Sequence, residues 1–133
     1  MKVAIVGSRS ITDYDLVSRF IQECYDFNSE YDKIISGGAR GVDTIAEKFA
    51  ETHKIRTVIF SPDWEQYGKN AGFIRNADII GKCDICIAIW DGFSSGTKND
   101  IELCEEMKKP CYIFNVNTNE KWVENTQFEI NFE

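Results

Sequence analysis

Short apolar runs alternate along the chain with longer stretches in which apolar residues recur every three or four positions. Continuous apolar runs are typical of parallel strands covered on both faces, and the wider spacing is typical of amphipathic helices. Strands are predicted at residues 3–6, 33–36, 56–60, 84–90 and 111–116. Helices are predicted at residues 16–24, 42–50, 72–80 and about 98–109, the last one ended by Pro110.

This alternation predicts one Rossmann-like, three-layer α/β domain with a parallel sheet of about five strands in the order 3-2-1-4-5. We expect the domain to occupy residues 1–116. We expect the tail, residues 117–133, to pack on the domain or on a dimer partner, because its apolar side chains would be costly to expose. The chain is therefore predicted to form a homodimer or a higher homo-oligomer. The apolar tail residues are Trp122, Phe128, Ile130 and Phe132.

Turns rich in small residues follow predicted strands 1, 2 and 4. In an open parallel sheet these turns meet at the carboxyl edge, and ligands bind where the strand order reverses. Glycines let the backbone approach a ligand closely, and the free N–H groups of a following helix attract anions. The turn after the second strand also carries Arg40, whose forked cation suits phosphate or carboxylate. An ordinary strand-to-helix turn is the alternative interpretation.

The length of 133 residues fits one domain, and the net charge is −7. Nucleic acids are usually bound by a broad basic surface, so this charge argues against nucleic acid as a partner. A small anion can still bind where a few cations converge, and Arg9, Arg40 and Arg75 are the candidates. No apolar run has the length of a membrane span, and the N-terminus enters a strand without a cleavable signal, so we expect a cytoplasmic protein that contacts no membrane.

Several familiar catalytic motifs are absent from the sequence. It has no G-x-G-x-x-G, no phosphate-binding loop, no H-E-x-x-H and no G-x-S-x-G, which argues against simple dehydrogenases, kinases and proteases. Its single histidine, His53, makes a histidine-based triad improbable. Cys83 and Cys86 have C-x-x-C spacing, but no second pair exists, and on a strand their side chains would face opposite ways. We therefore expect buried, reduced thiols, no metal and no cofactor.

Residues 36–43, together with Gly7-Ser8-Arg9, residues 72–76 and Gly96-Thr97, resemble the SLOG superfamily. The resemblance is greatest to the small YspA-type, cpYpsA-related SLOG proteins. More distant relatives are the "Lonely guy" phosphoribohydrolases and the DNA processing protein A family. The resemblance covers the chain from residue 1 to about residue 116, and it is specific for the superfamily but not for one reaction.

The resemblance implies a crevice that binds a nucleotide or a nucleotide-derived signal such as an ADP-ribose compound, in a sensing or sequestering role. The glycine turns would hold the phosphates, the arginines would neutralise their charge, and Asp43 or Asp100 would contact a ribose hydroxyl. The ligand-binding residues implied are Gly7, Ser8, Arg9, Gly37, Gly38, Ala39, Arg40, Gly41, Asp43, Arg75, Asn76, Trp90, Ser94, Ser95, Gly96 and Thr97.

The first alternative is a phosphoribohydrolase that cleaves the N-glycosidic bond of a nucleoside 5′-monophosphate. In the Lonely guy family the corresponding loop resembles P-G-G-x-G-T-x-x-E, and its glutamate acts with an arginine. Gly96 and Thr97 match this loop and Asp100 stands at the glutamate position, but residues 92–94 replace the proline and the first two glycines. Asp100 and Arg75 would then be catalytic. Alternatively, Asp100 closes a T-x-x-D capping box with Thr97 as the N-cap, and this capping role is favoured over catalysis.

The second alternative is single-stranded DNA binding, as the resemblance to DNA processing protein A implies. Such binding combines a basic groove with aromatic side chains on which bases stack. Trp64, Tyr67 and Trp90 could stack on bases, although packing is the favoured role for Trp64 and Tyr67. The acidic composition does not supply the basic residues that such a groove needs.

Overall fold

A computed structural model describes residues 1–125 of the chain. Six strands and five α-helices alternate along these residues. None of the helices within 1–125 combines the length and the apolar character needed to cross a bilayer. The elements are β1 (Lys2–Gly7), α1 (Tyr14–Cys24), β2 (Lys33–Ser36), α2 (Val42–Thr52), β3 (Arg56–Ile59), α3 (Trp64–Tyr67), a 3₁₀ turn (Gly68–Asn70), α4 (Ala71–Lys82), β4 (Ile85–Trp90), α5 (Ser95–Met107), β5 (Cys111–Asn115) and β6 (Glu120–Glu124).

The strands form one sheet in the order β3-β2-β1-β4-β5-β6. The first five are parallel, which confirms the predicted α/β class and strand order. A sixth strand, β6, adds antiparallel to β5, with Cys111 opposite Glu124. This strand is built from the first part of the predicted tail. Phe128, Ile130 and Phe132 lie outside the described residues.

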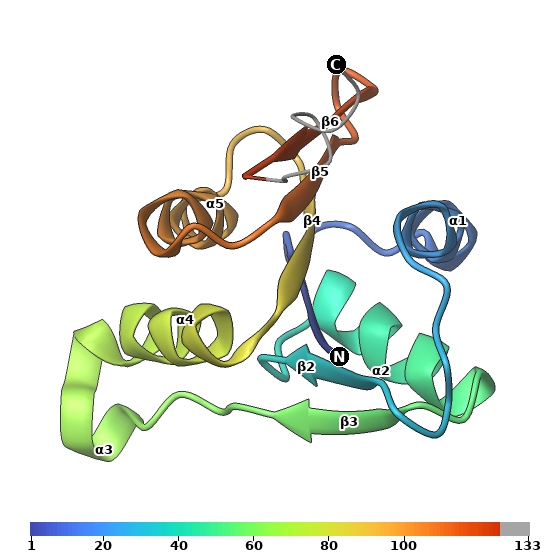
Figure 1. The fold of residues 1–133 in the computed structure, drawn as a ribbon. Coiled ribbons are helices and arrows are strands. Elements are labelled where there is room, and N and C mark those ends of the chain that lie inside the picture. The colour runs from blue at the N-terminus through green and yellow to red at the C-terminus, as the bar shows by residue number, and fades with distance from the viewer. Residues whose placement is uncertain (126–133) are drawn as a thin grey trace.

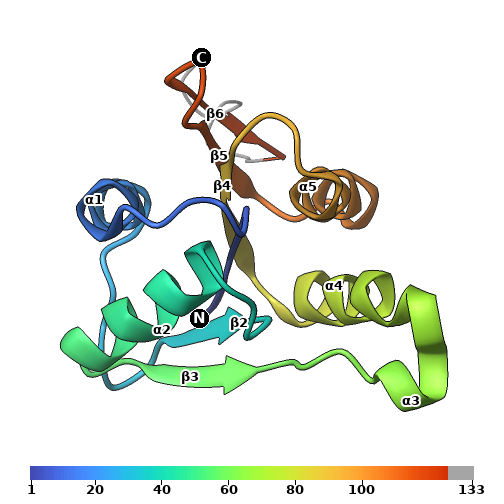
Figure 2. The ribbon, with the colours of Figure 1, turned by 180° about the vertical axis from the view of Figure 1, so that it is seen from behind.

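Helices cover both faces of the sheet, with α1 and α2 on one face and α4 and α5 on the other (Figures 1 and 2). Successive residues of a strand point to opposite faces, so β1 divides its side chains between two cores. Val3 and Ile5 pack against α1 and α2, whereas Ala4 and Val6 pack on the side of α4 and α5. The apolar runs of β1 and β4 are continuous because these central strands are buried on both faces, whereas the edge strand β3 is exposed.

Three local predictions are wrong. Residues 61–70, predicted as a polar loop, contain the short helix α3 and a 3₁₀ turn. The side chains of Trp64 and Tyr67 do not pack inside the molecule, since they are 56% and 40% exposed. In addition, α4 continues through Gly81, the predicted stop, to Lys82.

Candidate functional site

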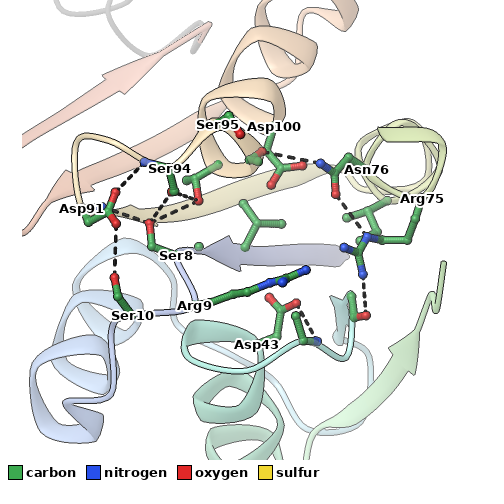
Figure 3. A pocket seen from close by; sticks show the side chains of 17 residues that line it. Ser8, Arg9, Ser10, Asp43, Arg75, Asn76, Asp91, Ser94, Ser95 and Asp100 are labelled. Carbon is green, nitrogen blue, oxygen red and sulfur yellow. Dashed lines mark hydrogen bonds between the residues drawn. The ribbon is translucent and has the colours of Figure 1, made fainter. Parts of the chain in front are cut away.

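A pocket of about 520 Å³ opens at the carboxyl ends of the parallel strands, where the strand order reverses between β1 and β4 (Figure 3). Four segments surround it: the turns after β1, β2 and β4, the last two continuing into the starts of α2 and α5, and residues 75–79 of α4. Three of the four are the segments that the sequence pattern places at this edge. The lining residues are Val6, Gly7, Ser8, Arg9, Ser10, Gly37, Ala39, Asp43, Arg75, Asn76, Ile79, Asp91, Ser94, Ser95, Gly96, Thr97 and Asp100.

Ser8 is the centre of a hydroxyl network on one side of this pocket. Its Oγ lies 2.7 Å from Oγ of Ser94 and 3.3 Å from Oγ1 of Thr97, and it accepts a hydrogen bond from the backbone N–H of Asp91 at 3.0 Å. Only 2% of Ser8 is exposed. The backbone carbonyl of Ser8 also accepts from the N–H of Val42 at the start of α2. Ser8 therefore ties together the three turns that line the pocket.

The carboxylate of Asp91 completes this network. Its Oδ1 accepts from the backbone N–H groups of Phe93 and Ser94, both at 2.8 Å, and its Oδ2 accepts from the hydroxyl of Ser10 at 3.1 Å. Burial acts to raise the pKa of Asp91, but the hydrogen bonds from Ser94, Phe93 and Ser10 outweigh it, and the net pKa lies below its usual value. Asp91 is thus an ionised, fully bonded structural anchor.

Two glycines allow the close approaches on which the site depends. A Cβ on Gly41 would lie 2.5 Å from the carbonyl oxygens of Ser8 and Arg9, and its φ of +74° is a conformation that favours glycine. A Cβ on Gly37 would lie 2.6 Å from Nη1 of Arg75. The bare backbone at these positions lets the β1 turn sit against α2 and the Arg75 side chain against the β2 turn.

Arg75 is held in place from two directions. Its Nη1 donates to the carbonyl of Gly37 at 2.6 Å, and its Nε donates to Oδ1 of Asn76 at 3.1 Å. Asn76 in turn donates to Oδ1 of Asn99 at 3.2 Å. Figure 3 shows the Arg9 side chain extending across the pocket from the opposite end, above Asp43. Two guanidinium groups therefore enter one pocket of an acidic protein.

Two buried carboxyl groups face each other across the pocket, Asp43 from α2 and Asp100 from α5 (Figure 3). Asp43 is 6% exposed, and its Oδ2 accepts from the N–H of Ala39 at 3.1 Å. Asp100 is 5% exposed, and its Oδ1 has no hydrogen-bond partner. Burial raises the pKa of both groups, and the negative charge of Asp43 raises the pKa of Asp100 further, against the attraction of Arg75.

The predicted capping role of Asp100 is wrong. Helix α5 begins at Ser95 and its N-cap is Ser94, so Thr97 lies inside the first turn and Asp100 lies one turn further along. The Thr97 hydroxyl bonds to Ser94 and Ser8 instead of capping the helix. The small residues at the start of α5 allow the helix to begin earlier than predicted. Asp100 consequently has no structural partner that explains its burial.

Most of the predicted site residues line the pocket, and four do not: Gly38, Arg40, Gly41 and Trp90. Arg40 is exposed on the turn after β2 and is not part of the lining. Trp90 lies behind the pocket wall, where its Nε1 donates to the carbonyl of Ser94 at 3.1 Å. Gly41 supports the β1 turn from outside, as its contacts with Ser8 and Arg9 indicate.

Four lining residues were absent from the predicted set: Val6, Ser10, Ile79 and Asp91. Asp91 follows the last residue of β4 directly, and polar residues at that position of a parallel strand are a usable signal. Ile79 lies one helical turn beyond Arg75 on α4, which places both on the same face. Val6 and Ser10 flank the Gly7-Ser8-Arg9 turn and carry no separate signal.

Comparison with known proteins places these features in a family. A model of the YspA, cpYpsA-related SLOG family matches residues 1–67. The Gene 61 protein of Mycobacterium phage D29 is 36% identical over 72 residues. That match covers 50% of this chain and 58% of the phage protein, so the chain spans less than two thirds of this relative's length.

Solved structures share the fold at low sequence identity. DNA processing protein A from Helicobacter pylori, described for its single-stranded DNA binding mode, superimposes with a TM-score of 0.69 at 22% identity, over 99% of this chain and 72% of that one. The Streptococcus pneumoniae protein of the same name superimposes with a TM-score of 0.67 at 22% identity, over 85% of this chain and 50% of that one. A protein called TM1055 superimposes with a TM-score of 0.64 at 18% identity, over 83% of this chain and 71% of that one.

These neighbours correct one expectation. The acidic net charge was expected to argue against nucleic acid as a partner, yet two neighbours are DNA processing protein A and one of them binds single-stranded DNA. Net charge sums the whole surface, whereas a ligand responds to the local field. Arg9 and Arg75 bring two cations into the pocket, beside Asp43, Asp91 and Asp100, so the total of −7 does not by itself exclude a nucleic acid.

Proposed function

Since the chain belongs to the YspA, cpYpsA-related SLOG family, we propose that its pocket binds a nucleotide or a nucleotide-derived phosphorylated compound. The observation that carries the proposal is the buried, unpartnered Oδ1 of Asp100, which lies opposite Asp43 in a pocket that also holds Arg75. Leaving a buried acceptor unsatisfied costs about 1–3 kcal/mol. A ligand hydroxyl that donates to this oxygen recovers that free energy.

The phosphate end of the ligand is assigned to the turns after β1 and β4. The first N–H groups of α5 have no side-chain cap, because Ser94 makes no capping hydrogen bond. Free N–H groups at a helix start attract anions, and the Arg9 side chain, which extends across the pocket, adds a cation. The volume of about 520 Å³ suits a ligand the size of a nucleoside monophosphate.

The sugar end is assigned to the two carboxyl groups. Ribose presents hydroxyl donors in pairs, and carboxyl oxygens are good acceptors for them. Asp43 and Asp100 come from different helices and point into the same space (Figure 3). The positive charge of Arg75 acts to lower the pKa of both carboxyl groups, against the larger effect of burial.

Thermal unfolding of the purified protein with a panel of ligands tests this proposal. The panel contains nucleoside 5′-monophosphates, ADP-ribose, ribose 5-phosphate, inorganic phosphate and a single-stranded oligonucleotide. A ligand at 100 times its dissociation constant should add about 2.7 kcal/mol of stability. No stabilisation by any phosphorylated small molecule would falsify the proposal, and stabilisation by the oligonucleotide alone would favour a DNA-binding role in its place.

Two arginines provide a matched comparison for the same measurement. Arg9 lines the pocket, and Arg40 lies on a neighbouring turn but outside the lining. Arg9→Ala should weaken binding about tenfold or more, as expected for loss of a charge-assisted hydrogen bond to phosphate. Arg40→Ala should leave binding unchanged. Equal losses in the two variants would show that the effect reflects overall charge rather than this pocket.

A second candidate function is hydrolysis of the N-glycosidic bond of a nucleoside 5′-monophosphate. It is favoured by the position of Asp100, which does not cap α5 and lies buried beside Arg75. In such a reaction water adds to the sugar carbon, the carbon–nitrogen bond breaks, and the base leaves with a proton. A carboxylate near the sugar stabilises the positive charge that develops there, and a cation holds the phosphate.

Release of free base from the nucleoside monophosphates distinguishes turnover from binding. Asp100→Asn keeps the side-chain size but removes the charge, so it should lower base release by about a hundredfold or more while leaving the fold intact. Because the reacting form of Asp100 is ionised and its pKa is raised, wild-type activity should increase as the pH rises through that pKa. Binding without turnover in wild type and variant would leave a sensing or sequestering role.

A further inference from the structure

Three buried cysteines converge on the face of the sheet covered by α4 and α5. Cys86 lies on β4, Cys111 on β5 and Cys104 on α5, which are adjacent elements (Figure 1). Cys86 and Cys111 are direct partners in the parallel pairing of the two strands. Their three sulfur atoms all lie within 4.8 Å of one another, and each residue is 0% exposed. Among residues 1–125 this is the one group of three or more potential metal ligands.

We propose that Cys86, Cys104 and Cys111 form a trigonal thiolate site for a single Cu(I) ion. This site is separate from the pocket, since none of the three residues lines it. It also differs from the C-x-x-C pair of the sequence, because Cys83 is left outside the group and its thiol donates to the carbonyl of Ile80 instead.

The geometry of the cluster suits three-coordination. A metal about 2.3 Å from each of three sulfurs in one plane holds those sulfurs about 4 Å apart. The sulfurs already lie within 4.8 Å of one another, so binding needs only a small contraction.

The surroundings favour a soft, monovalent ion. Thiolate ligands select Cu(I), zinc or iron–sulfur clusters, and zinc in a closed site takes four ligands. Within the described chain no fourth ligand joins the group, and the neighbouring side chains are apolar, among them Ala88, Ile80 and Ile113. These apolar side chains keep water away from the ion.

Positive charge lies close by to offset the thiolates. Nζ of Lys109 donates to the carbonyl of Cys83 at 2.7 Å, and the backbone N–H of Lys109 donates to the carbonyl of Cys104 at 2.9 Å. The opposite core, packed against α1 and α2, contains no buried cysteine among its described members, and Cys24 lies only at its rim. The buried thiols are therefore concentrated on the side of the sheet on which Lys109 lies.

Anaerobic titration of the reduced, full-length protein with Cu(I) tests the site. The ion is supplied as its complex with bicinchoninate, whose colour reports how much copper the protein removes. Wild type should bind one Cu(I) per chain. Cys104→Ala and Cys111→Ala should each bind at least about a hundredfold more weakly, a larger loss than removal of an outer-shell partner causes. Cys24→Ala is the control and should bind like wild type.

X-ray absorption of the copper-loaded wild type provides an independent readout that does not depend on the folding of any variant. Three sulfur neighbours at about 2.3 Å are expected. The proposal is overturned if wild type binds no more tightly than Cys104→Ala, if Cys24→Ala loses affinity equally, or if the bound copper has fewer than three sulfur neighbours.

Discussion

The two sides of the pocket use polar groups in opposite ways. On the hydroxyl side, Ser8, Asp91, Ser94 and Thr97 bond to one another and to the backbone, and Asp91 has a lowered pKa. On the carboxyl side, burial raises the pKa of Asp43 and Asp100, and one oxygen of Asp100 has no partner. The first arrangement stabilises the turns. The second is unfavourable for the empty protein and becomes favourable when a ligand supplies donors.

The largest effect on stability is expected on the hydroxyl side. Ser8→Ala removes the side-chain oxygen that meets Ser94, Thr97 and the N–H of Asp91, and leaves buried groups unsatisfied. The free energy of unfolding should fall by about 3 kcal/mol. Urea denaturation measures the change.

Ser95→Ala is the matched control for this variant, because Ser95 lines the same pocket but is exposed. Its free energy of unfolding should change by less than about 0.5 kcal/mol. A Ser8→Ala variant as stable as Ser95→Ala would mean that the hydroxyl network does not hold the turns together.

A moderate effect of the opposite sign is expected from Asp100→Asn. The pKa of Asp100 is raised in the folded state, so its protonated form favours folding, and this advantage is lost as the pH rises from about 3.8 through the folded pKa. The variant should therefore gain stability relative to wild type across that window, by about 1.4 kcal/mol for each unit of pKa shift. Urea denaturation at several pH values measures it. A difference that does not vary with pH would contradict the raised pKa.

The smallest effect is expected from Asp91→Asn. The pKa of Asp91 is lowered in the folded state, so the stability that its charge contributes is present above about 3.8 and is lost as the pH falls through the folded pKa. The variant should be less stable than wild type by about 1 kcal/mol at neutral pH, and the difference should shrink in acid. If Asp91→Asn and Asp100→Asn showed the same pH trend, the contrast between the two sides would be lost.

The sequence allowed the framework of the site to be predicted because the strands are continuous apolar runs and the glycine turns follow them directly. Gly7, Gly37 and Gly96 come together at the pocket through the strand order alone. The role of Asp100 could not be predicted, since a T-x-x-D spacing fits a cap equally well and only the start of α5 at Ser95 decides between them.

Contacts between segments far apart in the sequence could not be predicted from local sequence patterns. Cys86, Cys104 and Cys111 show no recognisable ligand spacing, because their convergence depends on the pairing of β4 with β5 and on the angle at which α5 crosses them. The exposure of Trp64 was missed for a related reason. Large aromatic residues are usually buried, but α3 projects beyond the layers of the fold (Figure 1), and no element within residues 1–125 buries Trp64.

The contact between Gly37 and Arg75 has an evolutionary consequence. A methyl group at position 37 would meet Nη1 of Arg75 at 2.6 Å, closer than Cβ atoms approach other atoms in folded proteins. A homologue with a side chain at position 37 must therefore move the end of its Arg75 side chain, which disturbs the hydrogen bond to the carbonyl of residue 37. We expect homologues that keep this pose of Arg75 to keep glycine at position 37, which lies 38 residues away in the chain.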